Sequence, residues 1–213
     1  KNASGITVVS KFLLEKMHQS SLKNKQEMII GNVTGNGKIM QHKNLDKKEV
    51  LLVADLVDDI KNISGVIRMI SGLDKAIRSS FRLRIIGGGR DEKMLKELCA
   101  ELLPGEEVIR FEGLKANEEV YQYLSESHFL VMNSRFETFS SICVEAFSCG
   151  IPVIATNCGG PGDFVNEENG ILIPVNDTEK LRSAFLYMLE HVSAYDPEKI
   201  RQFSLQHYGK ELI

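Results

Sequence analysis

The sequence lacks several features that would define a function at once. Its 213 residues contain 26 Lys and Arg against 29 Asp and Glu, a formal net charge of -3 at pH 7. The basic residues are dispersed, which excludes the electrostatic footprint of a nucleic-acid-binding protein. No apolar run approaches the roughly 20 residues that span a bilayer, and the N-terminus lacks the basic and apolar sectors of a signal peptide. We therefore expect a cytoplasmic protein without a nucleic-acid partner.

Cysteine is scarce and shows no pattern. Cys99, Cys143, Cys149 and Cys158 form no C-x-x-C pair, and the five histidines are scattered. This arrangement excludes a zinc site and an obvious disulfide framework. We expect four reduced thiols in the core and no metal site.

The common nucleotide motifs are also missing. The sequence contains no G-x-x-x-x-G-K-[ST] loop, and GGGRDEKM does not continue as a G-x-G-x-x-G fingerprint. Asp55, Asp58 and Asp59 do not form the D-x-D pair that would hold a metal against a diphosphate. These absences argue against P-loop hydrolysis, dinucleotide binding and a metal-held diphosphate. Cations and helix dipoles would have to neutralise a phosphate ligand.

A regular alternation of strand and helix patterns begins at Lys48. The apolar positions from Ile63 to Ile77 predict one helix, and a helix containing Met94 and Leu102 should stop before Pro104. The remaining helices are expected around 117–126, 140–149 and 177–191, and the strands at 49–56, 81–89, 107–113, 128–134, 152–156 and 170–175. Strands apolar on both faces and separated by helices predict a doubly wound α/β fold, Rossmann-like, with a parallel sheet.

The two ends of the chain have different patterns. ITVVSKFLLEKM near the N-terminus predicts a strand and the start of a helix, and the polar, glycine-rich stretch after it has no period. We expect residues 1–47 to be the end of a missing N-terminal domain plus a connector. Residues 48–195 would form the Rossmann-like domain, and 196–213 a terminal helix starting near Pro197 and packed on a neighbour.

Glycines gather at the predicted strand ends. They are Gly87, Gly88 and Gly89 after one strand, Gly113 after another, and Gly159 and Gly160 after a third. In an open parallel sheet, ligands bind beyond the carboxyl ends of the strands, where helix N-termini favour anions. Any one glycine cluster is explained as well by a tight turn. Together the clusters favour a phosphorylated ligand.

Glu137 and Glu145 carry a family resemblance. In the frame NSRFETFSSICVEAFSCGIPVIATNCGG they resemble the E-x7-E signature of the retaining glycosyltransferases of family 4, also called group 1, which have the GT-B fold. The ordered series of motifs from about Val50 to His191 is similar to that family's C-terminal domain. The resemblance implies a donor-binding half: a sugar moves from a nucleotide-sugar donor to a hydroxyl of an acceptor glycan, lipid or small molecule. It also implies that the N-terminal domain supplies the acceptor site, and it allows peripheral association with the inner face of a membrane.

The resemblance implies roles for individual residues. Glu137 would contact the sugar and Lys61 the phosphate, and these two are the expected catalytic residues. Glu145 would accept hydrogen bonds from the ribose, although with Ser141 and Ser148 it also fits a polar stripe facing water. The other expected donor contacts are Gly87 and Gly88, Gly113 and Leu114 near the base, and Thr138, Phe139, Ser140 and Ser141 through backbone amides, with Ser140 or Ser141 as the N-cap.

The sequence departs from the family at two positions. Asp55 replaces a common arginine six residues before Lys61, so either another cation such as Arg90 substitutes or donor binding is weaker, and Arg90 fits equally well as a partner of Asp91 or Glu92. Ser140 stands where glycine is frequent. Because no D-x-D pair is present and Lys61 would meet the diphosphate, we expect metal-independent chemistry with no cofactor besides the nucleotide-sugar substrate. Two alternatives stay open: a GT-B nucleotide-sugar epimerase, and a non-catalytic nucleotide-sugar-binding module, which Asp55 favours.

Overall fold

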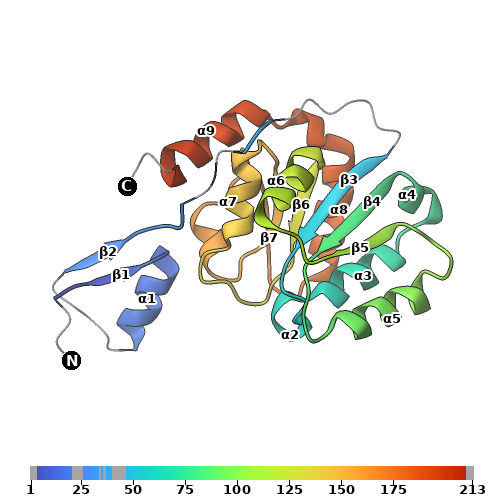
Figure 1. The fold of residues 1–213 in the computed structure, drawn as a ribbon, viewed down its shortest axis with the longest axis horizontal. Helices are drawn as coiled ribbons and strands as arrows, with labels where there is room; N and C mark the ends of the chain where they lie inside the picture. The colour runs from blue at the N-terminus through green and yellow to red at the C-terminus, as the bar shows by residue number, and fades with distance from the viewer. Residues whose placement is uncertain (1–3, 21–25, 34, 36, 40–46, 210–213) are drawn as a thin grey trace.

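A six-stranded parallel sheet forms the centre of the molecule (Figure 1). The computed structural model describes residues 4–20, 26–33, 35, 37–39 and 47–209. The strands are β3 (Lys48–Val53), β4 (Phe81–Ile86), β5 (Ile109–Gly113), β6 (Phe129–Met132), β7 (Val153–Thr156) and β8 (Gly170–Ile173). Every neighbouring pair is parallel. The predicted strands and their parallel arrangement are confirmed.

The strand order creates a switch point in the middle of the sheet. The order is β5-β4-β3-β6-β7-β8, so the chain first builds outward from β3 and then returns to add β6 on its other side. Val50 pairs with Phe129 and Leu51 with Leu130 across this junction. Crossover loops diverge there and leave a crevice beyond the strand ends.

Helices cover both faces of the sheet (Figure 1). The helices α3 (Ile63–Ser71), α5 (Glu92–Leu102) and α8 (Thr178–His191) pack on the face that includes Val50 and Leu52. The helices α6 (Asn117–Glu126), α7 (Ser141–Ser148) and α9 (Pro197–Tyr208) pack on the opposite face, which includes Leu51. Because successive side chains of a strand point to opposite faces, each buried strand contributes to both cores. The doubly wound arrangement is confirmed.

The predicted single helix from Ile63 to Ile77 is wrong. The helix α3 ends at Ser71, and a separate short helix, α4 (Lys75–Ser79), follows. Gly72 caps α3, and the Arg78 guanidinium donates back to the carbonyl groups of Ser71 and Leu73 in the turn. Leu73 is still buried. The apolar spacing therefore predicted correctly which residues are buried, but it did not predict the end of the helix at Ser71.

The N-terminal segment forms a small unit beside the main sheet (Figure 1). The expected strand and helix are present as β1 (Ile6–Val8) and α1 (Lys11–Gln19). A strand that the sequence did not predict, β2 (Glu27–Ile29), pairs in parallel with β1. Residues 21–25, 34, 36 and 40–46 of the predicted connector lie outside the described residues.

Contacts attach α1 to the main domain. The Asp163 carboxylate, at the end of the 3-10 helix η1 (Gly160–Asp163), accepts from the backbone N–H of Lys11 at 2.8 Å. Ser10 Oγ donates to the Thr138 carbonyl at 2.6 Å and accepts from Leu13 N–H at 3.1 Å. The start of α1 therefore lies against the loop that contains Glu137.

The terminal helix α9 begins at Pro197, as predicted, and packs on α7. The Asp196 carboxylate accepts from the backbone N–H of Glu198 at 3.0 Å. Ser204 Oγ donates to the Val144 carbonyl of α7 at 3.1 Å. This contact confirms the expected packing of the terminal helix on a neighbour.

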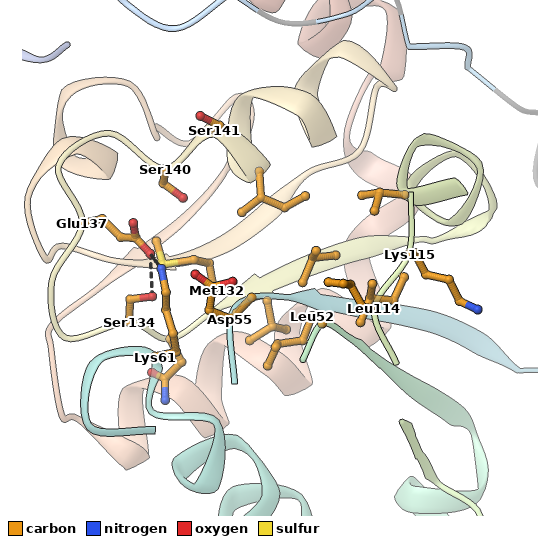
Figure 2. A pocket seen from close by; sticks show the side chains of 18 residues that line it. Leu52, Asp55, Lys61, Leu114, Lys115, Met132, Ser134, Glu137, Ser140 and Ser141 are labelled. Atoms are coloured by element: carbon orange, nitrogen blue, oxygen red, sulfur yellow. Dashed lines mark hydrogen bonds and ion pairs between the residues drawn. The ribbon is translucent and has the colours of Figure 1, made fainter. Parts of the chain in front are cut away.

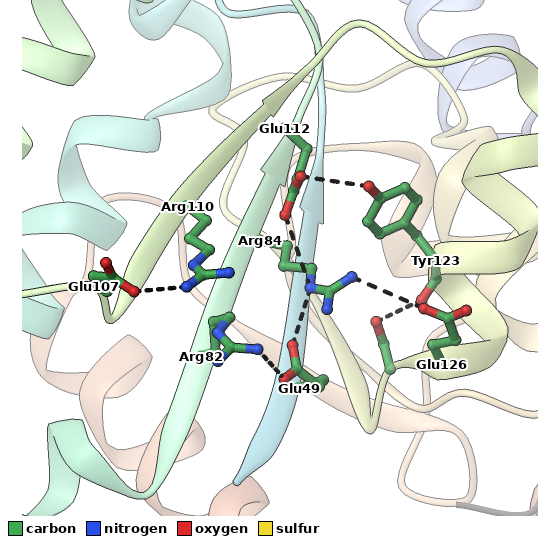
Figure 3. Close-up of polar contacts among 9 residues, drawn as sticks. Glu49, Arg82, Arg84, Glu107, Arg110, Glu112, Tyr123 and Glu126 are labelled. Atoms are coloured by element: carbon green, nitrogen blue, oxygen red, sulfur yellow. Dashed lines mark hydrogen bonds and ion pairs between the residues drawn. The ribbon is translucent and has the colours of Figure 1, made fainter. Parts of the chain in front are cut away.

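Charged side chains occupy part of the sheet next to α6 (Figure 3). Arg84 Nε lies 3.1 Å from Glu49 Oε2, and the Arg84 guanidinium also faces Glu112 and Glu126. Arg82 Nη1 donates to Glu49 at 2.9 Å. Opposite charges thus neutralise one another along this part of the sheet.

The cysteines form no disulfide, and one of the expected core positions differs. Cys143, Cys149 and Cys158 are buried, whereas Cys99 on α5 is only half-buried. Burial raises the pKa of the Cys143 thiol to about 12. Among the described residues, no helix combines the length and the apolar character needed to cross a membrane.

Candidate functional site

A cavity of about 270 Å³ lies at the switch point of the sheet (Figure 2). It is bounded by the ends of β3 and β6, the start of α7 and the loop after β5. Its lining residues are Leu52, Val53, Ala54, Asp55, Lys61, Ile86, Gly87, Leu114, Lys115, Val120, Val131, Met132, Asn133, Ser134, Glu137, Ser140, Ser141 and Ile142. The cavity thus has an apolar floor and a polar end.

The polar end contains an ion pair between the two expected catalytic residues. Lys61 Nζ lies 2.6 Å from Glu137 Oε1, and Ser134 Oγ donates to the same oxygen at 2.8 Å (Figure 2). The side chains of Lys61 and Glu137 are 21% and 15% exposed. Each charge is therefore compensated by the other, and both side chains remain accessible from the cavity.

A one-turn helix positions Lys61. This helix, α2 (Asp58–Lys61), was not predicted, and it ends at Asn62 in the left-handed conformation with φ 49°. The Asp91 carboxylate accepts from the backbone N–H of Asp58 at 2.8 Å. Lys61 is thus the last residue of a short helix that precedes α3.

The Gly159–Gly160 pair shapes the loop of Glu137. The backbone N–H of Glu137 donates to the Cys158 carbonyl at 3.2 Å, and Gly160 N–H donates to the Glu137 carbonyl at 3.0 Å. Gly159 has φ +135°, and a Cβ there would collide with the Glu137 carbonyl oxygen. These glycines allow their loop to approach the loop of Glu137 closely. Their role is therefore to make room for the Glu137 backbone.

The glycines expected to contact the donor divide into two groups. Gly87 lines the cavity with φ +139°, and a Cβ there would collide with the Ala54 carbonyl. Gly88 and Gly113 are not among the lining residues. Leu114 lines the cavity and is 80% exposed, so it is a surface group beside the opening rather than a packing residue.

The start of α7 presents Ser140 and Ser141 to the cavity. Ser140 is the N-cap, in agreement with the prediction, but it adopts the left-handed conformation with φ 76° and makes no side-chain capping bond. Thr138 is exposed and does not line the cavity. The Phe139 side chain is 3% exposed and packs 5.5 Å from the ring of Phe164, so only its backbone remains as a donor contact.

Glu145 lies on α7 outside the lining residues. It is half-buried, and this burial raises the pKa of its carboxyl group. Its negative charge contributes, after burial, to the raised pKa of Tyr121 on α6. Among the described residues, no hydrogen bond or ion pair to the Glu145 carboxylate is present. Glu145 is therefore not a freely exposed residue facing water, which was one of its two expected environments.

The structure does not bring Arg90 into the cavity. Arg90 Nη2 pairs with Asp59 at 2.7 Å, is largely exposed and lies outside the lining. Asp55 lines the cavity and is exposed. Lys115, which the sequence analysis missed, also lines it, across from Lys61 (Figure 2). Its position directly after Gly113 and Leu114 was the available signal.

The fold and the cavity define the class of the protein. A doubly wound sheet with a cavity at its switch point is the arrangement in which α/β domains bind nucleotide ligands. The family model "Glycosyl transferases group 1" matches residues 37–203. The chain belongs to this family, and its fold is that of the GT-B glycosyltransferases.

Three similar proteins illustrate the comparison. The chain is 29% identical over 211 residues to an uncharacterized glycosyltransferase of Methanocaldococcus jannaschii, covering 99% of this chain and 54% of that protein. It is 29% identical over 158 residues to a GDP-mannose-dependent alpha-mannosyltransferase of Corynebacterium glutamicum, covering 73% and 36%. The Anabaena protein HepE, solved in complex with UDP-glucose, superimposes with a TM-score of 0.81 at 17% identity, covering 98% and 61%.

The chain thus spans about half the length of the curated relative that it matches over nearly its whole sequence. In the described part of the chain, no group of three His, Cys, Asp or Glu side chains is placed to hold a metal ion.

Proposed function

We propose that this chain is the donor-binding half of a retaining glycosyltransferase of family 4. The observation that carries the proposal is the Lys61–Glu137 pair, which places a cation and a carboxylate at the polar end of the switch-point cavity. The family match supports sugar transfer. The GDP-mannose and UDP-glucose named for two similar proteins support a nucleotide sugar as donor.

In the proposed complex, the donor separates the ion pair. Its diphosphate binds the Lys61 ammonium, and its sugar binds the Glu137 carboxylate. The bond between the sugar and the phosphate breaks, and the nucleoside diphosphate leaves with the bonding electrons. The acceptor hydroxyl oxygen bonds to the sugar as its proton passes to the leaving phosphate. Lys61 stabilises the negative charge on the leaving phosphate, because a preorganised cation does so better than water.

The nucleoside occupies the rest of the site. We assign the ribose to Glu145, whose half-buried carboxylate lacks a described partner, and the base to the region of Leu114 and Lys115.

Residues 48–195 form the donor domain in this proposal, 196–213 its terminal helix and tail, and 1–47 the connection to a further domain that supplies the acceptor site.

A non-catalytic module that binds nucleotide sugars is the second candidate. Asp55 favours it, because an exposed carboxylate on the cavity repels a diphosphate. Both candidates predict donor binding, whereas only the enzyme transfers sugar.

The test uses the full-length protein. A thermal-shift screen of UDP-, GDP- and ADP-sugars should identify one donor, because a ligand that binds the native state raises the melting temperature. Incubation with that donor should then release nucleoside diphosphate by transfer or hydrolysis. Donor binding without any release would favour the module, and no binding at all would contradict both candidates.

The same assay tests metal independence. Because Lys61 and helix amides would meet the diphosphate, turnover after EDTA treatment should equal that of the untreated protein. Loss of turnover on EDTA treatment, restored by Mg²⁺ or Mn²⁺, would contradict this part of the proposal.

A further inference from the structure

Arg135 lies two residues before Glu137 but does not line the cavity. Its Nη1 donates to the carbonyl oxygens of Asp58 at 2.6 Å and Asp59 at 3.2 Å. Its backbone N–H donates to the Ile60 carbonyl at 2.6 Å. One residue therefore binds three successive carbonyl groups of α2, the helix that carries Lys61.

The helix α2 depends on such external partners. A helix leaves its last four carbonyl groups without intrahelical donors, and a single turn is unstable alone. In the four-residue α2, these are all of its carbonyl groups. The N-cap Val57 provides no side-chain bond, and the N–H of the C-cap Asn62 satisfies only the Asp58 carbonyl. Arg135 thus supplies side-chain and backbone donors to three carbonyl groups of α2, while Asp91 and Ser64 bind its first residue, Asp58.

The guanidinium also connects α2 to two other loops. Arg135 Nη2 donates to Asn62 Oδ1 at 2.7 Å, and Nε donates to Asn176 Oδ1, after β8, at 2.9 Å. Asn133 Nδ2, at the end of β6, donates to the Asn62 carbonyl at 3.1 Å. These directions require the planar fork of arginine, which a lysine ammonium does not reproduce.

We infer that Arg135 is a positioning residue that fixes the Lys61 ammonium at the polar end of the cavity. The inference rests on the proposed function, in which Lys61 meets the donor diphosphate. Segment 135–137 holds the helix of Lys61 through Arg135 and the ammonium itself through Glu137. Once the diphosphate replaces Glu137, Arg135 still holds α2, so the cation stays preorganised.

A double-mutant cycle on this chain tests the inference. Affinity for UDP, GDP and ADP is measured by titration calorimetry for the wild type, Lys61→Met, Arg135→Met and the double variant. Arg135→Met should weaken binding about tenfold, on the scale of one charge-assisted hydrogen bond. In the Lys61→Met background it should cause no further loss, because residues that act through one group are not additive.

Two further variants control for charge and for folding. Arg110→Met removes an arginine that pairs with Glu107 at 2.6 Å on β5 (Figure 3), and it should leave affinity unchanged. The cycle is repeated with Arg135→Lys, which keeps the charge and one donor group, so the test does not depend on the folding of Arg135→Met. A positioning role predicts that Arg135→Lys also weakens binding and is also non-additive with Lys61→Met.

The outcomes are distinguishable. Additive losses, or wild-type affinity in Arg135→Lys, would overturn the positioning role alone, the latter because charge would then suffice. Unchanged affinity in Lys61→Met, or a wild-type chain that binds none of UDP, GDP and ADP, would overturn the proposed function together with this inference.

Discussion

Two glutamates eight residues apart lie in different environments. Glu137 is compensated by Lys61 at 2.6 Å and by Ser134 at 2.8 Å, inside the cavity. Glu145 has no described hydrogen-bond partner, and burial raises its pKa. A half-buried charge without a partner costs free energy of folding. Such a position is explained if a ligand supplies the missing hydrogen bonds.

Replacement of Glu145 with Gln should therefore weaken nucleotide binding. The loss of a charge-assisted hydrogen bond to the ribose is worth about 1.5–3 kcal/mol. Calorimetry with UDP and GDP measures the effect, and Glu101→Gln, at an exposed position on α5, is the matched control. Equal affinities for Glu145→Gln and the wild type would show that Glu145 does not contact the nucleotide.

The same variant should increase fold stability at neutral pH. Because the folded-state pKa of Glu145 is raised, the native state binds a proton more readily than the unfolded chain. Its contribution to stability thus falls as pH rises from about 4.3, the ordinary value, through the raised pKa. Urea unfolding should show Glu145→Gln to be more stable than the wild type above this window and nearly equal below it. A variant less stable at neutral pH would contradict the burial argument.

At the scale of elements, the start of α7 combines strain with access to the cavity. Ser140 holds a left-handed backbone with φ 76° and lines the cavity. This conformation costs a non-glycine residue about 1–2 kcal/mol. Glycine would adopt this backbone turn without strain, because it has no Cβ.

Ser140→Gly should accordingly stabilise the fold. Glycine loses about 0.5–1 kcal/mol more than alanine on folding, so relief of the strain should leave a net gain of about 0.5–1 kcal/mol. Ala146→Gly, within the regular part of α7, should instead destabilise by about 1 kcal/mol. Urea unfolding compares the two, and destabilisation by Ser140→Gly would show that the Ser140 side chain contributes more than its backbone costs.

The elements that the sequence predicted are those with long apolar patterns. The helix from Asn117 to Glu126 and the helix after Asp177 were predicted almost to the residue. The helix α2 and the strand β2 were missed, because four and three residues are too few to show a period.

The candidate site was predicted only in part, for a related reason. Lys61, Glu137 and Gly87 line the cavity, and motif order was enough to find them. Arg90 is held by Asp59, and Arg135 binds carbonyl groups 75 or more positions earlier in the chain. Such contacts depend on how three loops that are distant in the sequence are arranged in space. A local sequence pattern does not predict that arrangement.

At the scale of the whole molecule, the cavity lies beyond the carboxyl ends of the strands at the switch point of the sheet. It is formed by loops of a single domain, and the chain spans 54% of the M. jannaschii relative. None of the described residues has a proposed role in binding or activating an acceptor. Donor binding and sugar transfer should therefore be separable.

The isolated 213-residue chain is expected to fold and bind nucleoside diphosphate but not to transfer sugar to an acceptor. Binding depends on the switch-point cavity, whose two core clusters lie within the chain. Transfer also requires an oriented acceptor, and loss of that orientation removes a large part of the rate enhancement. Calorimetry with UDP and GDP measures the first property, and turnover of the chain beside the full-length protein measures the second. Mixing the chain with the separately expressed remainder of the protein is the control for a missing partner. Transfer by the chain alone at the full-length rate would show that the acceptor site lies within these residues, and that one domain is sufficient for the reaction.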